Sequence, residues 1–282
     1  MSTTTRQRKY AVLLCGHLGP KLESRWGHMA HMLQVLLQDP DGDEQWDTHP
    51  VCDGQFPTQD QLQSYQGLVV SGGAADAFSK EPWILQLRQV LQEEHARGQR
   101  ILGVCFGHQL LAEALGGRAG RATTGLELGA RVIRTLPALQ QHWFGAACPS
   151  GWTFPLHESH QDQVLEIPPG AQLLASSDIT RMEMLVYSPH CMSVQGHPEF
   201  SADFMHSLIQ HWMDRGRQDS TPAEPDPSES SSEFELGNMH CKEGERMACN
   251  LSQPSTRWYV EVIAKAKFGF ASVVMQCEMP QF

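Results

Sequence analysis

The sequence predicts an α/β fold in which helices flank a mostly parallel central sheet. Two features predict it: short, wholly apolar segments, and amphipathic segments that alternate with them along the chain. A strand that is buried on both faces is apolar throughout, and strands that alternate with helices form parallel sheets covered on both sides. The chain has 282 residues, 40% of them hydrophobic, so it is long enough to bury a large core.

The first half of the chain alternates between predicted strands and helices. The apolar run 10–15 predicts a strand, and residues 25–38 carry apolar side chains at helical spacing. The run 68–70 predicts a second strand, which ends in Ser-Gly-Gly. An amphipathic helix is predicted over 82–97, with proline at its start, where a helix tolerates it.

The second half continues the alternation up to about residue 215. A strand over Ile101–Val104 leads into a predicted helix over Gly107–Leu115. Further strands are predicted at 131–136, 171–176, 184–187 and 192–195, and a helix at 201–215 closes the domain.

The composition changes near residue 218 and divides the chain into three parts. Residues 9–217 form the predicted α/β domain. Residues 218–236 are rich in Ser, Pro and acidic residues, and they cannot bury enough apolar surface to order themselves, so we expect a disordered acidic linker. Residues 237–282 form an unassigned C-terminal extension, expected to be disordered or irregular.

The charge and the termini exclude several classes of protein. The 21 basic residues against 32 acidic ones give a net charge of −11, which disfavours nucleic-acid binding. No run approaches the length of a membrane helix, and the polar first residues do not resemble a secretory signal, so no membrane partner is expected. The eight cysteines include no CxxC pair, which favours a reduced, cytoplasmic protein.

The main chemical signal is the motif Gly103-Val104-Cys105-Phe106-Gly107, at a strand-to-helix junction. A nucleophile held in such a tight turn needs small neighbours, and the start of a helix favours the thiolate. The N–H of Phe106 would point toward an oxyanion formed at the substrate. A buried cysteine in a glycine-rich turn, without chemistry, is the alternative.

A second signal is His197-Pro198-Glu199, at the end of another predicted strand. A thiol nucleophile needs a base for its proton, and a carboxylate can orient the imidazole of that base. A turn histidine next to proline is the alternative. Cys105 and His197 both lie at carboxyl ends of predicted strands, the edge at which open parallel sheets bind ligands.

Together these motifs resemble the class I (triad) glutamine amidotransferase-like family over about residues 9–215. The elbow continues to Gln109, as in that family, and the late His-Pro-Glu is its second signature. The chain resembles in particular the subgroup of stand-alone γ-glutamyl peptidases and the glutaminase domain of GMP synthase. Supporting segments are 53–57, 82–84, 160–164 and 195–200. The resemblance implies a flavodoxin-like glutaminase fold.

The resemblance also implies roles for individual residues. Cys105 would be the nucleophile that forms a thioester, His197 the general acid/base and Glu199 its orienting carboxylate. Backbone N–H groups of Gly73 and Phe106 would bind the oxyanion, and Gln109, His160 and Asp162 would lie at the substrate groove. For Gln109 a helix-packing role stays open, and His160 and Asp162 could instead satisfy a loop.

The implied function is a cysteine hydrolase of γ-glutamyl amide or peptide bonds, acting on glutamine, glutathione or a γ-glutamyl peptide. One alternative is a glutaminase subunit that delivers ammonia to a separate synthetase, since the chain has no synthetase domain and no P-loop. A second is a non-catalytic binding protein. No cofactor is implied, and no metal site is expected, because His240, Cys241 and Cys249 match zinc-binding spacing poorly.

Overall fold

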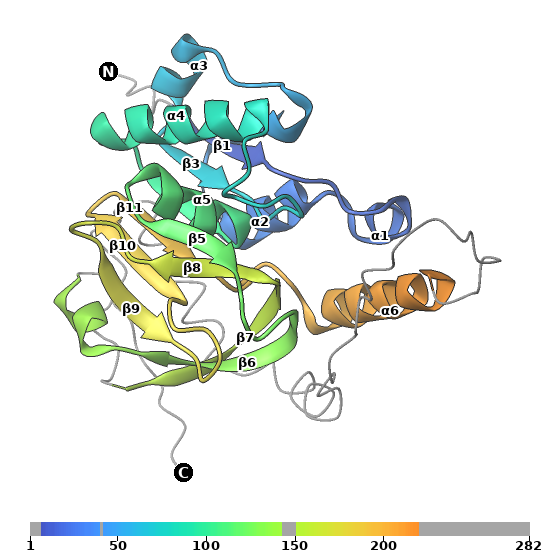
Figure 1. The fold of residues 1–282 in the computed structure, drawn as a ribbon. Helices are drawn as coiled ribbons and strands as arrows, with labels where there is room; N and C mark the ends of the chain where they lie inside the picture. The colour runs from blue at the N-terminus through green and yellow to red at the C-terminus, as the bar shows by residue number, and fades with distance from the viewer. Residues whose placement is uncertain (1–6, 40–41, 143–150, 220–282) are drawn as a thin grey trace.

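The structure is a computed structural model that describes residues 7–39, 42–142 and 151–219 (Figure 1). The strands are β1 (Arg8–Leu14), β2 (Glu44–Pro50), β3 (Gly67–Val70), β4 (Ile101–Val104), β5 (Arg118–Arg121), β6 (Glu127–Thr135), β7 (Thr153–His160), β8 (Asp162–Glu166), β9 (Gln172–Ser176), β10 (Met184–Ser188) and β11 (Cys191–Val194). The helices are α1 (Pro20–Trp26), α2 (Met29–Leu37), α3 (Gln59–Ser64), α4 (Pro82–Ala96), α5 (Phe106–Ala114) and α6 (Ala202–Asp219), with 3-10 helices η1 (Val51–Asp53) and η2 (Pro137–Gln141).

Within the described ranges, nine strands form one sheet in the order β2-β1-β3-β4-β11-β10-β9-β6-β7, and β5 pairs with β8 in a second sheet. The first five strands of the large sheet run parallel to their neighbours. The carboxyl ends of β1, β3, β4 and β11 therefore meet at one edge. This confirms the predicted mostly parallel, helix-flanked sheet.

Side chains on β1 show why its sequence is apolar throughout. Val12 packs on one face of the sheet, in a cluster with Leu33 of α2. Leu13 packs on the other face, with Leu87 of α4 and Leu110 of α5. Since successive residues of a strand point to opposite faces, a strand covered on both sides needs apolar residues at every position.

The other strands of the sheet, β10, β9, β6 and β7, are antiparallel to their neighbours. β10 and β11 are joined by the two residues Pro189 and His190, a connection too short for a parallel crossover. At the far end, β7 curves back toward β11, and the backbone N–H of His197 donates to the carbonyl of His157 at 2.7 Å. The antiparallel half thus folds back onto the strand that leads to His197.

Two local predictions differ from the structure. The single helix expected over 25–38 is two helices, because Gly27 adopts a φ of 76° and ends α1 before α2 begins. The closing helix α6 runs to Asp219, and so includes the first two residues of the predicted linker. Residues 220–282, which hold the rest of the linker and the extension, lie outside the described residues. No helix in the described ranges has the length and apolar character needed to cross a membrane.

Candidate active site

Cys105 occupies a strained turn between β4 and α5. Its φ is 51° and its ψ is −104°, and among the described residues it is the one non-glycine residue with a positive φ. The backbone N–H of Cys105 donates to the carbonyl of Val194 on β11 at 2.9 Å, which holds the turn against the neighbouring strand. Such strain persists only where the surrounding structure enforces it, and it is typical of functional sites.

The two glycines that flank the turn are there for steric reasons. A methyl group on Gly103 would lie 2.5 Å from the carbonyl oxygen of Gly107, and one on Gly107 would collide with the carbonyl oxygen of Val70. Both contacts involve backbone atoms, which cannot move aside as a flexible side chain could. The requirement for small neighbours around the elbow, expected from the sequence, is confirmed.

Replacing Gly107 by alanine should therefore destabilise the fold. Because the methyl group can fit only if α5 moves away from β3, we expect the free energy of unfolding to fall by about 1–3 kcal/mol. Urea unfolding followed by circular dichroism measures this. The control is Gly19→Ala, whose methyl group would meet a side-chain atom of His211 at an ordinary 3.4 Å and should cost less. Equal losses in both variants would contradict the steric explanation.

His197 lies beyond the end of β11 and is held from three directions. Its Nδ1 lies 2.8 Å from Oε1 of Glu199, its ring stacks on Phe200 at a centroid distance of 4.0 Å, and its N–H is bound by β7. Burial alone would lower the pKa of His197, but the neighbouring side chains of Glu199 and Cys105 together raise it well above its usual value. The site therefore favours the imidazolium.

Cys105 and His197 lie close together, since both adjoin Gly72. Glu199 occupies Nδ1 of His197, so Nε2 is the ring nitrogen left for the sulfur. Gly72 packs against both: a methyl group there would lie 2.9 Å from Cε1 of His197 and 3.6 Å from Cβ of Cys105. Sequence reasoning did not single out Gly72, although it belongs to the predicted Ser-Gly-Gly turn.

The two residues whose N–H groups were predicted to bind the oxyanion follow Gly72 and Cys105 directly in the sequence. Gly73 follows Gly72 and packs closely on β1, so that a methyl group there would lie 2.6 Å from the carbonyl oxygen of Cys15. Phe106 is the first residue of α5, and its ring is buried and stacks on Trp83 at 5.5 Å. The first N–H groups of a helix have no acceptor within the helix, so that of Phe106 is available.

The other predicted site residues come together at the same edge. Gln109 donates its amide to the carbonyl oxygen of Asp162 at 2.8 Å and to Oε1 of Gln195 at 3.2 Å. Nδ1 of His160 lies 3.0 Å from the same carbonyl oxygen, and the Asp162 carboxylate pairs with Arg121 at 3.0 Å. Burial raises the pKa of Asp162 to about 6, against the opposing effect of Arg121. The amide of Gln109 thus makes the helix-packing contacts that the sequence left open.

Comparison with known proteins identifies the family. Residues 48–213 match the family described as glutamine amidotransferase class-I. The chain belongs to this family. It is 37% identical over 232 residues to γ-glutamyl peptidase 5 of Arabidopsis thaliana, in an alignment that covers 78% of this chain and 91% of the relative.

Other amidotransferases support the assignment. A putative glutamine amidotransferase of Saccharomyces cerevisiae is 33% identical over 190 residues, which cover 63% of this chain and 78% of that protein. The crystal structure of a glutamine amidotransferase from Thermotoga maritima superposes with a TM-score of 0.64 at 19% identity, covering 92% of this chain and 99% of the other. At that identity the likeness concerns the fold, and it confirms the flavodoxin-like amidotransferase architecture.

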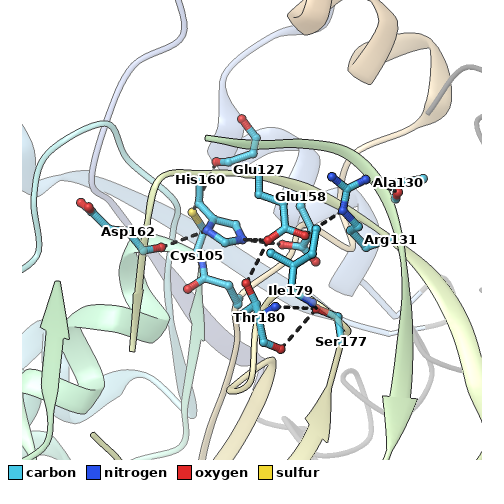
Figure 2. A network of polar contacts seen from close by, with 12 residues as sticks. Cys105, Glu127, Ala130, Arg131, Glu158, His160, Asp162, Ser177, Ile179 and Thr180 are labelled. Carbon is cyan, nitrogen blue, oxygen red and sulfur yellow. Dashed lines mark hydrogen bonds and ion pairs between the residues drawn. The ribbon is translucent and has the colours of Figure 1, made fainter. Parts of the chain in front are cut away.

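This member of the family also holds a group of buried acidic side chains that sequence reasoning missed. Glu127, Glu158 and Glu183 are each no more than 3% exposed. Figure 2 shows the imidazole of His160 between the backbone of Asp162 and the carboxyl groups of Glu127 and Glu158, with Cys105 beside it. Nε2 of His160 lies 3.5 Å from Glu127 and 3.2 Å from Glu158. The side wall of the site is therefore a buried network of acids around one histidine.

The three acids differ in their surroundings. Glu127 receives hydrogen bonds from Arg131 and Thr180, each at 2.9 Å, which compensate a negative charge. For Glu158 and Glu183, burial and the neighbouring acids raise the pKa well above the usual value. Both side chains therefore hold their protons to higher pH than a carboxyl group in water does. In the sequence, the only sign of Glu127 and Glu158 as buried acids is their position in the segments that form β6 and β7. Acidic residues usually face solvent, so this sign is weak.

Glu183→Gln should make the fold less sensitive to alkaline pH. An unfolded glutamate titrates near about 4.3, whereas folded Glu183 keeps its proton to higher pH. Its contribution to stability is complete below the unfolded pKa and is lost as pH rises toward the folded pKa. Glutamine does not titrate. As pH rises, the free energy of unfolding of the variant should therefore increase relative to that of wild type, by up to about 1.4 kcal/mol per pH unit.

Urea unfolding of both proteins at pH 5, 6.5 and 8, at constant ionic strength, measures this gain. Glu93→Gln is the control, because Glu93 is exposed on α4 and its substitution should leave the pH dependence unchanged. Parallel stability curves for Glu183→Gln and wild type would show that Glu183 is ionised in the fold.

Proposed function

We propose that this chain is a cysteine hydrolase that cleaves γ-glutamyl amide or peptide bonds. One observation carries the proposal: Cys105, in its strained turn, lies within reach of His197, whose other ring nitrogen is held 2.8 Å from Glu199. This is the arrangement of a nucleophile, a general base and an orienting carboxylate. The substrate class follows the name of the Arabidopsis relative, γ-glutamyl peptidase.

In the proposed reaction, the thiol proton of Cys105 resides on Nε2 of His197, as the raised pKa of His197 favours, and the sulfur of the resulting thiolate attacks the γ-carbonyl carbon of the glutamyl group. The resulting oxyanion accepts hydrogen bonds from the N–H groups of Phe106 and Gly73. His197 then gives its proton to the leaving nitrogen, the C–N bond breaks, and a thioester remains on Cys105. Water, deprotonated by His197, cleaves the thioester, releases glutamate and returns the proton to the sulfur.

The remaining predicted residues are proposed to shape the glutamyl pocket. Gln109 supports this part of the site indirectly, because its amide ties α5 to the backbone of Asp162 and to Gln195. The segment from Ser159 to Asp162 passes close to the nucleophile, since Sγ of Cys105 lies 3.9 Å from the carbonyl oxygen of Ser159. His160 and Asp162 are thus proposed to position this segment beside the substrate.

The alternative, a glutaminase subunit that delivers ammonia to a separate synthetase, uses the same chemistry. The alignment with the Arabidopsis peptidase covers 91% of that protein, which leaves little of its length for a further domain. The name of that relative, a peptidase, favours the stand-alone hydrolase. We also propose a cytoplasmic location, which the free thiols of the four cysteines in the described ranges support.

The proposal is tested with the purified full chain, by following glutamate released from glutamine, glutathione and a γ-glutamyl dipeptide. We expect turnover of glutathione or the dipeptide to exceed that of glutamine, with Cys105→Ala as the inactive control. Hydrolysis of glutamine alone would favour the amidotransferase subunit. No hydrolysis of any of the three substrates, with Cys105 unreactive toward an electrophilic glutamine analogue, would leave a binding protein.

A further inference from the structure

Three metal-ligating side chains meet beside the active-site edge, where β1 and β2 end. His17 lies in the loop between β1 and α1, and Cys52 and Asp53 lie in η1, directly after β2. Nε2 of His17 is 2.9 Å from Oδ2 of Asp53 and 3.7 Å from Sγ of Cys52, and this sulfur is 3.8 Å from Oδ1 of Asp53. One ligand atom from each residue thus lies within 4.8 Å of the other two.

The second ring nitrogen of His17 faces a carboxylate. Its Nδ1 lies 3.8 Å from Oε1 of Glu23, and Nδ1 of His28 approaches the same oxygen at 3.3 Å. Metal-bound histidines commonly donate their second N–H to a carboxylate, which fixes the tautomer and raises the basicity of the ligating nitrogen. Glu23 stands where such a partner is needed, and His28 holds it there.

We propose that His17, Cys52 and Asp53 bind a zinc ion, with Glu23 as the partner that orients His17. Zinc bonds of about 2.3 Å to sulfur and about 2.0–2.2 Å to nitrogen and oxygen set separations of about 3.3–3.6 Å between tetrahedral ligands. The separations from Nε2 of His17 to Sγ of Cys52 and to Oδ2 of Asp53 are within about 0.5 Å of that range, and one ligand atom of each residue lies within 4.8 Å of the other two. The combination of thiolate and imidazole selects zinc over magnesium or calcium, which prefer oxygen ligands.

The ligand side chains are accessible to a metal ion from solvent, with 45% of the His17 side chain and 44% of the Asp53 side chain exposed. The fourth coordination position is left to water. Bound zinc would fasten the loop after β1 to η1. Gly16, next to His17, packs against Gly73, since a methyl group on Gly16 would lie 3.0 Å from Cα of Gly73. Zinc would therefore stiffen the backbone behind the proposed oxyanion donor.

Sequence spacing could not find this site, because His17 and Cys52 are 35 residues apart and only the pairing of β1 with β2 brings them together. The proposal also differs from the sequence prediction of no metal site. It does not depend on hydrolase activity, so it stands or falls separately from the proposed function.

The test is zinc binding by the full chain, freed of metal with a chelator and titrated in competition with a colorimetric zinc indicator. Cobalt replaces zinc in a parallel titration, in which a thiolate-to-cobalt charge-transfer band reports a bound sulfur. We expect Cys52→Ser and His17→Ala each to lose one equivalent of zinc and the corresponding cobalt band. Glu23→Gln should keep the equivalent but bind it about 10–100-fold more weakly.

Two control variants separate this site from others on the chain. Cys105→Ala removes the buried cysteine that lies near His197, and His31→Ala removes an exposed histidine on α2; both should keep the equivalent that Cys52→Ser loses. Equal zinc binding by wild type and Cys52→Ser, loss of the equivalent only in Cys105→Ala, or no competition with the indicator by wild type would each overturn the proposal. Circular dichroism checks that every variant is folded.

Discussion

Replacing Cys105 by alanine will lower kcat/KM for a γ-glutamyl substrate by about 10⁴-fold or more. The substitution removes only the sulfur, and the side chain is already buried at 5% exposure, so the fold should survive. Without the sulfur no thioester can form, and the oxyanion donors and the bound substrate alone remain. Released glutamate, measured under single-turnover and steady-state conditions, gives the loss.

Cys191→Ala is the matched control for this loss. Cys191 is a buried cysteine on β11, next to the strand that carries Cys105, and it has no proposed part in the chemistry. Its variant should keep activity within a few fold of wild type. Retention of more than a few per cent of wild-type activity by Cys105→Ala would rule out covalent catalysis by this residue.

Replacing Glu199 by glutamine will lower kcat by about 10²–10⁴-fold and move the alkaline limb of the pH profile. Glutamine keeps the shape of the side chain but not the charge. Because Glu199 raises the pKa of His197, its loss lowers that pKa, and the imidazolium that protonates the leaving group is lost at lower pH. We expect the alkaline limb of kcat/KM to fall by about one pH unit or more.

A shift of the alkaline limb distinguishes two explanations for the lower activity of Glu199→Gln. Loss of the charge beside His197 moves the limb, whereas general damage to the site lowers activity equally at every pH. Glu93→Gln, on the exposed side of α4, provides the profile of a carboxylate substitution far from His197. A Glu199→Gln profile with the wild-type alkaline limb would mean that Glu199 supports the fold and not the charge of His197.

The residues predicted for the candidate site come together in the fold because local patterns determine their positions. Cys105 and His197 each follow a short apolar strand, and parallel strands bring such ends to one edge. Gln109 follows from the elbow, one turn further along α5. The glycines around the elbow could be explained from the sequence because the turn itself requires them. A methyl group on Gly103 would collide with Gly107, and one on Gly107 would collide with Val70 of the neighbouring strand β3.

Most features that the sequence did not predict depend on contacts between segments that are far apart along the chain. The acids Glu127, Glu158 and Glu183 are buried by the fold-back of the antiparallel half, which no local pattern records. Strand β2 is polar along its length and gave no apolar run, although it pairs with β1 through seven residues. The break at Gly27 was overlooked because apolar spacing continues on both sides of it.

The return of β7 to the end of β11 has a consequence for how this protein loses activity on heating. His197 follows β11, which pairs with β4 in the parallel half of the sheet. Its N–H donates to the carbonyl of His157 on β7, in the antiparallel half. Partial opening of either half, of the kind that hydrogen exchange detects in native proteins, would release the histidine while most of the core stays packed. Heat inactivation would then begin below the temperature at which the parallel sheet melts, and activity would be the more sensitive gauge of native structure.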